Sequence, residues 1–397
     1  MMIGTNIYNF SQLIYHFLAG RFLGKAGYGD LAAIISVLGL LGIIHGAFGL
    51  TIVKFIAQEK GHSKVADFIK WIYRWNLIIG LVISLSIILV APLLSNFLNI
   101  SNPKSVYLLG PILLIFFVTS AGRNVFQGLL KFDKFVYSLL AEAGGKVIFT
   151  IVLFFAGLAV AGALLGFFAG LLLSFIITTF LLRHYVFGKI NKNPDFRSFF
   201  KYSLAVTAQG ISLTSMYTVD LILVKHFFPA DTAGLYAALA ILGRIVFFGT
   251  TPITQVMFPL IARRHLDGQK YLRILYLSII LVTLISTAIV GFYYLYPAIP
   301  ISLLYGKGFL ERASILWWFG AFMGILSIAT LLTQFYLSIG KTKVVGLFIA
   351  AAILQAVLIW FMHSDILTVI QLSIFSATLL TLGLFVYFVY LYYPRVK

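Results

Sequence analysis

Apolar stretches of about 20 residues recur along the whole chain, and they restrict what this sequence can fold into more than any other feature. Segments of this length match α-helices that cross the roughly 30 Å hydrocarbon core of a bilayer. Only 10% of the 397 residues are charged and 61% are hydrophobic, so a water-soluble domain would lack the charges to cover its surface. The apolar runs are continuous rather than alternating, which argues against an outer-membrane β-barrel. We therefore predict an all-α polytopic membrane protein.

The hydropathy pattern predicts about twelve transmembrane helices. The first apolar segment starts at Met1 without a basic region before it, so we expect a retained helix rather than a cleaved leader. The longer segments would tilt in the bilayer or protrude from it. The predicted helices span residues 3–22, 31–53, 75–97, 106–130, 136–158, 161–182, 199–224, 232–262, 272–297, 313–338, 342–362 and 366–393.

A charged segment around Pro194 divides these helices six and six. We predict an N-terminal six-helix lobe at 1–185, a cytoplasmic linker at 186–198 and a C-terminal six-helix lobe at 199–397. Because each lobe holds an even number of helices, both would have the same orientation, as in a parallel pseudo-two-fold repeat. The lobes also share a pattern of small residues, with Gly29, Ala32 and Ala33 lining up with Gly234, Ala237 and Ala238.

The basic residues are divided unevenly between the two sides of the predicted membrane protein. Of the 29 Lys and Arg residues, three lie within helices and six, including Arg21 and Lys25, lie on one side. The other 20 lie in the loops after helices 2, 4, 6, 8 and 10 or at the C-terminus. Because short loops rich in Lys and Arg face the cytoplasm, we predict a multi-pass protein of the inner (plasma) membrane with both termini cytoplasmic. Topology thus explains the net charge of +18, and we expect no nucleic-acid partner.

Three charged residues of the first lobe are predicted to lie inside the membrane. Arg123 and Glu142 are almost equally far from the turn at Phe132 and Asp133, so antiparallel helices would put them at the same depth. Lys146 follows Glu142 by four residues and shares its helical face. Together the three would form a cluster with a net charge of +1, which either holds a phosphate or an acidic sugar or only locks the two helices.

The second lobe has two charged residues within its predicted helices. Asp220 lies near the outer end of the seventh helix and Arg244 nearer the middle of the eighth, at depths that differ by roughly 9 Å. An extended Arg244 side chain could still reach Asp220, so we expect a pair that fixes the hairpin, and both residues are also candidates for substrate binding. Asp220 and His16, which falls near its repeat equivalent, are candidates for proton or sodium coupling, although a lone intramembrane His is more often a packing residue.

The sequence contains no pattern typical of an active site. The predicted loops are short, and they hold no Walker, metal-ligand or triad pattern. No strand precedes Gly144-Gly145 or Gly27-x-Gly29, so we interpret these glycines as helix-packing or turn residues. There is no cysteine for a thiolate metal site. We therefore expect neither an enzyme nor a bound cofactor or metal.

Two groups of motifs resemble those of a known family. Residues 21–24 (Arg-Phe-Leu-Gly) and 27–32 (Gly-Tyr-Gly-Asp-Leu-Ala) look like the first-hairpin signature of polysaccharide exporters of the O-antigen flippase type. Residues 220–223 and 233–244 look like the seventh and eighth helices of that family. The plan of six plus six helices extends the resemblance over the whole chain.

The resemblance implies the fold of the superfamily that also contains multidrug and toxin extrusion (MATE) transporters and lipid II flippases. It implies two lobes around a central cavity that opens alternately to either side. It also implies a substrate with a polyprenyl tail in the lipid and a sugar–phosphate head in the cavity, moved to the outer leaflet for surface polysaccharide synthesis. Polysaccharide polymerases and glycosyltransferases are then candidate partners, beside membrane lipid.

Three functions remain open on this basis. The chain is a flippase for a lipid-linked oligosaccharide, a cation-coupled multidrug exporter of the same superfamily, or a non-transport membrane protein such as a polymerase or scaffold. The cationic cluster favours the first, because the head group of a lipid-linked oligosaccharide carries phosphate. An exporter of drug cations would prefer unpaired carboxylates, and the only acids predicted in the membrane are Glu142 and Asp220. The short loops disfavour the third function.

Overall fold

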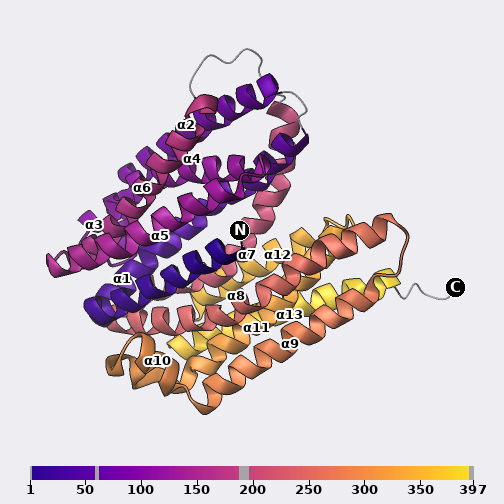
Figure 1. The fold of residues 1–397 in the computed structure, drawn as a ribbon. Coiled ribbons are helices and arrows are strands. Elements are labelled where there is room, and N and C mark those ends of the chain that lie inside the picture. The colour runs from indigo at the N-terminus through magenta and orange to yellow at the C-terminus, as the bar shows by residue number, and fades with distance from the viewer. Residues whose placement is uncertain (1, 59–61, 187–195, 393–397) are drawn as a thin grey trace. The chain divides into compact units, whose positions relative to one another are not determined.

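The computed structural model describes residues 2–58, 62–186 and 196–392, and every regular element within these ranges is a helix (Figure 1). The chain divides into two compact units, which are unit 1 (Met1–Ile211) and unit 2 (Ser212–Lys397). The predicted all-α polytopic fold class is confirmed. Most of the predicted linker, residues 187–195, lies outside the described residues, and the proposed lobe boundaries stay a prediction.

Each of the twelve predicted helices overlaps a helix of the structure. Unit 1 contains α1 (Met2–Gln58), α2 (His62–Phe97), α3 (Lys104–Tyr107), α4 (Leu109–Gly128), α5 (Phe132–Phe155), α6 (Ala159–Val186) and the first half of α7 (Phe196–Phe227). Unit 2 contains the rest of α7, then α8 (Ala230–Leu266), α9 (Leu272–Leu295), α10 (Ala298–Leu304), the 3-10 helix η1 (Lys307–Ile315), α11 (Leu316–Ser338), α12 (Val344–Phe361) and α13 (Ile366–Tyr392). The short elements α3, α10 and η1 were not predicted.

Ten helical segments of the described residues are long and apolar enough to cross a membrane. One of them, Ile7–Ile43, lies entirely in α1 and covers parts of the first two predicted helices. The 32-residue helix α7 is not among the ten. Two predicted helices share the α1 segment and one lies in α7, and the other nine predicted helices each correspond to one of the nine remaining segments.

α1 combines the first two predicted helices around a break at one residue. Gly24 has φ 65° and ψ −173°, whereas its neighbours on both sides are helical. A positive φ of this size is readily adopted only by glycine, so this residue allows the chain to leave one helical arm and enter the next. The segment predicted to connect the two helices, residues 23–30, is therefore helical apart from Gly24.

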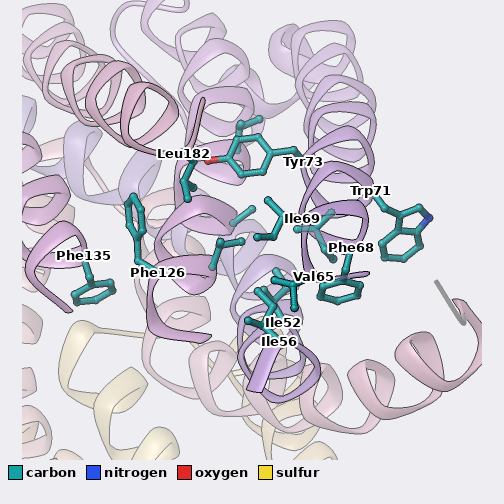
Figure 2. Close-up of a cluster of buried hydrophobic side chains, with 14 of the residues drawn as sticks. Ile52, Ile56, Val65, Phe68, Ile69, Trp71, Tyr73, Phe126, Phe135 and Leu182 are labelled. Atoms are coloured by element: carbon teal, nitrogen blue, oxygen red, sulfur yellow. The ribbon is translucent and has the colours of Figure 1, made fainter. Parts of the chain in front are cut away.

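α2 begins at His62, well before the predicted start of the third helix at residue 75. In this extension Val65, Phe68, Ile69 and Ile72 stand at positions i, i+3, i+4 and i+7, which is one face of a helix, and all four are buried. They belong to an apolar cluster at one end of unit 1, to which α1, α4, α5 and α6 also contribute (Figure 2). The members of this cluster are Ile52, Ile56, Val65, Phe68, Ile69, Trp71, Ile72, Tyr73, Val118, Ala121, Val125, Phe126, Phe135, Leu139 and Leu182. Burial of one apolar face thus keeps this charged segment helical.

The core of unit 2 is organised around α11, which packs against α8, α9 and α13. Two buried tyrosines tie these helices together by donating to backbone carbonyls. Tyr293 of α9 donates to the carbonyl of Leu242 in α8 at 2.8 Å, and Tyr336 of α11 donates to that of Leu384 in α13 at 2.7 Å. A hydroxyl group buried in the membrane needs a hydrogen-bond partner from the protein, because lipid tails offer none. These two bonds supply that partner.

Candidate functional site

The hairpin of α4 and α5 brings Arg123 and Glu142 together inside unit 1. The Nη2 atom of Arg123 lies 2.5 Å from Oε2 of Glu142, and both side chains are buried. The predicted pairing is confirmed, but α4 ends at Gly128 and α5 begins at Phe132. Arg123 thus lies five residues before the end of α4, and Glu142 lies ten residues after the start of α5. The two backbone positions therefore differ in depth by roughly 7 Å, and the long Arg123 side chain spans this difference to reach Glu142.

Three hydroxyl residues complete the surroundings of the Arg123 guanidinium. Its Nε atom donates to Oγ of Ser138 at 2.8 Å, and its Nη2 atom also donates to Oγ of Ser174 in α6 at 2.7 Å. Thr178, one turn further along α6, donates to Oγ of Ser138 at 2.7 Å. The guanidinium therefore links three helices (α4, α5 and α6) through charge-assisted and neutral hydrogen bonds.

Lys146 is held on the other side of Glu142 by residues from the first arm of α1. Its Nζ atom donates to Oε1 of Gln12 and lies 4.8 Å from the centre of the Tyr15 ring. The ring of Phe167 in α6 is at 5.2 Å. Aromatic faces attract a cation most strongly where water is excluded, and Lys146 is fully buried. The third predicted member of the cluster thus lies beside the ion pair.

Tyr8 joins the two halves of this arrangement. Its hydroxyl donates to Oε1 of Glu142 at 2.7 Å, so that Glu142 is bonded by both Tyr8 and Arg123. The Nζ atom of Lys146 lies 5.8 Å from the Tyr8 ring. We call the set of Tyr8, Gln12, Arg123, Ser138, Glu142, Lys146 and Ser174 the unit 1 polar cluster. It carries the predicted net charge of +1 when Arg123, Glu142 and Lys146 are charged and Tyr8 is neutral.

Close contact between α5 and α6 allows the unit 1 polar cluster to form. A Cβ atom placed on Gly170 of α6 would lie 2.5 Å from the backbone nitrogen of Lys146 and 2.6 Å from the carbonyl oxygen of Glu142. A Cβ atom on Gly145 would lie 3.0 Å from Cα of Gly170. Gly145 is thus a helix-packing residue as predicted, whereas a Cβ atom on Gly144 would meet nothing within 4 Å. Only glycine permits backbones to approach this closely.

The unit 1 polar cluster is enclosed by the helices of its own unit. Arg123 is 8% exposed, Glu142 2% and Lys146 0%. The apolar cluster adjoins it at one end, because Leu139 follows Ser138 and Leu182 lies one turn beyond Thr178. The arrangement joins α1, α4, α5 and α6, which is the helix-locking alternative raised by the sequence. Contact of these charges with a substrate stays a prediction.

In unit 2 the expected pair of Asp220 and Arg244 does not form among the described residues, and this correction has a geometric reason. Asp220 and Tyr236 lie eight residues on either side of Phe228, at the turn between α7 and α8, and so share one depth. The hydroxyl of Tyr236 accordingly donates to Oδ2 of Asp220 at 2.7 Å. Arg244 lies two turns further along α8, and its Nη2 atom donates to the carbonyl oxygen of Tyr217 at 2.5 Å.

Arg244 has an incomplete set of hydrogen-bond partners among the described residues. Its side chain is half-buried, and its Nε atom has no hydrogen-bond partner among the residues that the structure describes. Its Cζ atom lies 5.3 Å from the centre of the Tyr217 ring, and that ring contacts Phe247 and Phe248. A guanidinium has five N–H donors in a fork that fits phosphate or carboxylate oxygens. The unsatisfied Nε atom is itself buried, so an anion would have to approach the half-buried guanidinium through its other N–H donors.

His16 lies in an aromatic environment in the first arm of α1. Its Nδ1 atom is 3.1 Å from the hydroxyl of Tyr28, and its ring makes edge contacts with the rings of Tyr15 and Tyr28. These contacts are those of a hydrogen-bonded residue that packs between helical segments, which is one of the two roles considered for His16. Proton or sodium coupling through His16 or Asp220 stays a prediction.

The sequence model of the polysaccharide biosynthesis protein family matches residues 1–265 of the 397 residues. The chain belongs to the polysaccharide biosynthesis protein family. The matched region covers all of unit 1 and all but the last residue of α8, so the unit 1 polar cluster and Arg244 both lie within the part shared with this family. No curated protein matches the sequence.

Solved structures of transporters share the fold of this family member over almost its whole length. An inward-facing MATE family multidrug resistance transporter of the MOP superfamily aligns with a TM-score of 0.80 over 97% of this chain and 96% of its own, at 13% identity. The lipid II flippase MurJ in an inward closed conformation aligns with a TM-score of 0.78 over 98% and 87%, at 16% identity. A MOP superfamily transporter from Pyrococcus furiosus aligns with a TM-score of 0.66 over 98% and 94%, at 16% identity. At such identities the likeness shows the fold alone.

Several polar residues of this family member were not predicted as site residues, although the sequence contains signals for some of them. Tyr236 could have been found by the rule that paired Arg123 with Glu142, because it is as far from the turn as Asp220. Ser138 lies one turn before Glu142 on the same helical face. Tyr8 and Ser174 come from helices distant in the sequence, so no local spacing places them at the cluster.

Proposed function

We propose that this member of the polysaccharide biosynthesis protein family moves a polyprenyl-phosphate-linked oligosaccharide from the cytoplasmic to the outer leaflet by alternating access. The family supports a role in polysaccharide synthesis, and the fold is that of MOP superfamily transporters. The fold is common to drug exporters and to a lipid flippase, so the choice of substrate rests on the chain's own residues.

The observation that carries the proposal is Arg244. A charged side chain within a transmembrane helix costs at least about 2.5–3.5 kcal/mol on insertion scales, and such residues face the protein interior or a water-filled space. The Nε donor of Arg244 is buried without a partner among the described residues, and Asp220 interacts with Arg244 electrostatically without forming a direct ion pair. The phosphate of a lipid-linked sugar supplies oxygens that accept hydrogen bonds from such a fork. A drug cation would instead be repelled.

The sugar head group of the lipid-linked oligosaccharide is the part that needs a protein in order to cross the bilayer. Each sugar hydroxyl moved into hydrocarbon without a partner costs about 4–8 kcal/mol on alkane scales, so an oligosaccharide cannot cross the bilayer unaided. The polyprenyl tail has no such cost and can stay in the lipid. The protein therefore has to supply polar partners only for the phosphate and the sugars.

The unit 1 polar cluster has a different role in this proposal. The hydrogen bonds of Arg123 and Lys146 are directed at residues of their own unit, and these residues leave Arg123 only 8% exposed and Lys146 fully buried. We propose that the cluster holds the first arm of α1 against α5 and α6. Arg123 and Lys146 would contact substrate only in a state in which Tyr8 and Gln12 have moved away. His16 and Asp220 remain the candidates for proton or sodium coupling.

The orientation proposed for the plasma membrane has both termini in the cytoplasm. The 20 basic residues on one side against six on the other motivate it. Reporter fusions after Lys60, Lys192 and Lys341 are expected to report the cytoplasm, and fusions near Lys104 and Lys307 the outer side. A reversed result at two or more of these sites would contradict the assignment.

A transport measurement on the purified protein tests the proposed function. The probe is a polyprenyl-diphosphate-linked trisaccharide with a fluorescent label on its sugar, placed in both leaflets of lipid vesicles. A membrane-impermeant quencher destroys only the label on the outside. Vesicles with the protein are expected to lose nearly all fluorescence, whereas empty vesicles keep about the half that the inner leaflet holds. Equal quenching in both samples would contradict the proposal.

A further inference from the structure

The accessible side of α8 carries two different stripes of residues. Arg244, Phe248, Thr251 and Gln255 are separated by four, three and four residues, so they share one helical face. Each of these four is exposed or half-buried. The neighbouring exposed stripe is apolar and consists of Ile245, Gly249, Pro252 and Val256. We call the first set the α8 polar stripe.

The chemistry of the two stripes indicates which one faces lipid. The apolar stripe can contact acyl chains without cost. The α8 polar stripe cannot do so, because a guanidinium and an amide in hydrocarbon would each need partners that lipid tails lack. The polar stripe therefore faces a space that admits water or a polar ligand. Phe248 is one turn from Arg244, so its ring is accessible from that space too.

The rings around Arg244 form a supported aromatic surface. Phe248 is 57% exposed, and its ring contacts that of Tyr217 at 6.5 Å and that of Phe247 at 5.5 Å. Phe247 is buried and fills the space behind them. The hydroxyl of Tyr217 is fixed by a 2.9 Å hydrogen bond with Thr214. An exposed ring that is held by two others has little freedom to lose when a ligand packs on it.

We infer that the α8 polar stripe is the sugar-binding subsite of the transporter, with Phe248 stacking on a sugar ring and Gln255 bonding to sugar hydroxyls. A sugar ring has a face of C–H groups that suits the negative face of an aromatic ring. The amide of Gln255 both donates and accepts hydrogen bonds, as hydroxyl groups require. Arg244 and Gln255 are about 16 Å apart along the helix, which is enough for a phosphate and a short oligosaccharide. This inference rests on the proposed function and adds a second contact region to it.

Binding measurements on the full-length purified protein separate the sugar contact from the phosphate contact. The two probes are the polyprenyl-diphosphate trisaccharide and the same polyprenyl phosphate without sugar. Phe248→Leu keeps the apolar character but removes the ring, so the affinity for the first probe is expected to fall about tenfold. Its affinity for the sugarless probe should change less than about twofold, within experimental scatter. Phe248→Trp is expected to bind both probes as wild type does.

Two further variants complete the experiment. Phe375→Leu in α13 removes a ring of similar exposure, at 51%, outside the stripe and is expected to change neither affinity. Gln255→Leu, at an exposed position, should repeat the selective loss of the first probe. Equal loss for both probes, or no loss in either stripe variant, would overturn the sugar-binding subsite while leaving the proposed function intact. Failure of the wild type to bind the trisaccharide probe would instead remove the proposed function, and this inference with it.

Discussion

Charge reversal at Arg244 is expected to lower transport of a lipid-linked oligosaccharide by about 100-fold or more, because it replaces a charge-assisted contact to phosphate by repulsion. Arg244→Lys keeps the charge but loses the planar fork, so a loss of about tenfold is expected. The vesicle assay measures both variants, with the amount of folded protein determined by gel filtration. Because Arg244 is half-buried, a Glu at this position can turn toward solvent and the protein should still fold.

Arg263→Glu provides the matched control for this experiment. Arg263 lies in the same helix, is 86% exposed and is 3.9 Å from Asp267 in a surface pair that contributes little. Transport by this variant should equal that of wild type. If Arg244→Glu retained more than half of the wild-type rate, the guanidinium would not be the phosphate contact. If Arg244→Glu and Arg263→Glu reduced transport equally, general electrostatics rather than a site would be the cause.

Loss of the carboxylate at Glu142 is expected to be among the most destabilising single changes in unit 1. Glu142→Gln leaves both Arg123 and Lys146 buried without a carboxylate, and breaking a buried ion pair in this way costs about 3–5 kcal/mol in the free energy of unfolding. Tyr8 would also lose its charged acceptor. Thermal unfolding in detergent or in lipid nanodiscs measures the change as a lowered Tm.

A double variant shows whether Glu142→Gln destabilises unit 1 because it leaves the buried cations unbalanced or because it changes the packing of the side chains. Arg123→Met with Glu142→Met removes both charges, so the net charge of the cluster returns to +1, and the Tm is expected to lie above that of Glu142→Gln. Ser138 and Ser174 keep their mutual bonds in this variant. The control Asp133→Asn at the exposed start of the same helix should cost less than about 1 kcal/mol. A Tm of Glu142→Gln equal to that of Asp133→Asn would show that the ion pair does not stabilise unit 1.

The sequence correctly predicted that the two intramembrane charges Arg123 and Glu142 of one helical hairpin pair with each other. The rule that antiparallel helices bring together residues equally far from their turn predicted this pair with the turn at Phe132 and Asp133. α4 in fact ends at Gly128 and α5 begins at Phe132, so the two residues are unequally far from the turn and the reach of the Arg123 side chain completes the pair.

The same rule, applied to α7 and α8, would have selected Tyr236 for Asp220. The expected Arg244–Asp220 pair failed because it relied on side-chain reach across two helical turns, and the nearer carbonyl of Tyr217 takes the guanidinium instead.

Other features depend on contacts that no local pattern contains. The extension of α2 to His62 is stabilised by the apolar cluster, whose members come from five helices. The bonds from Tyr8 and Gln12 to the α5 charges join residues 134 positions apart in the sequence. Hydropathy predicted the spans because a segment in lipid must form all its backbone hydrogen bonds within its own helix. Side-chain partners on different helices depend on tertiary packing, which the local sequence does not contain.

The most direct test of the central claim deletes the gene and follows the glycan in the cell. A flippase for lipid-linked oligosaccharide predicts that complete lipid-linked repeats accumulate on the cytoplasmic side while the surface glycan is lost. Expression of the wild-type protein should restore the surface glycan, and expression of Arg244→Glu should not. Normal surface glycan after the deletion, in a strain with no second flippase, would contradict the account and favour the export of another kind of substrate.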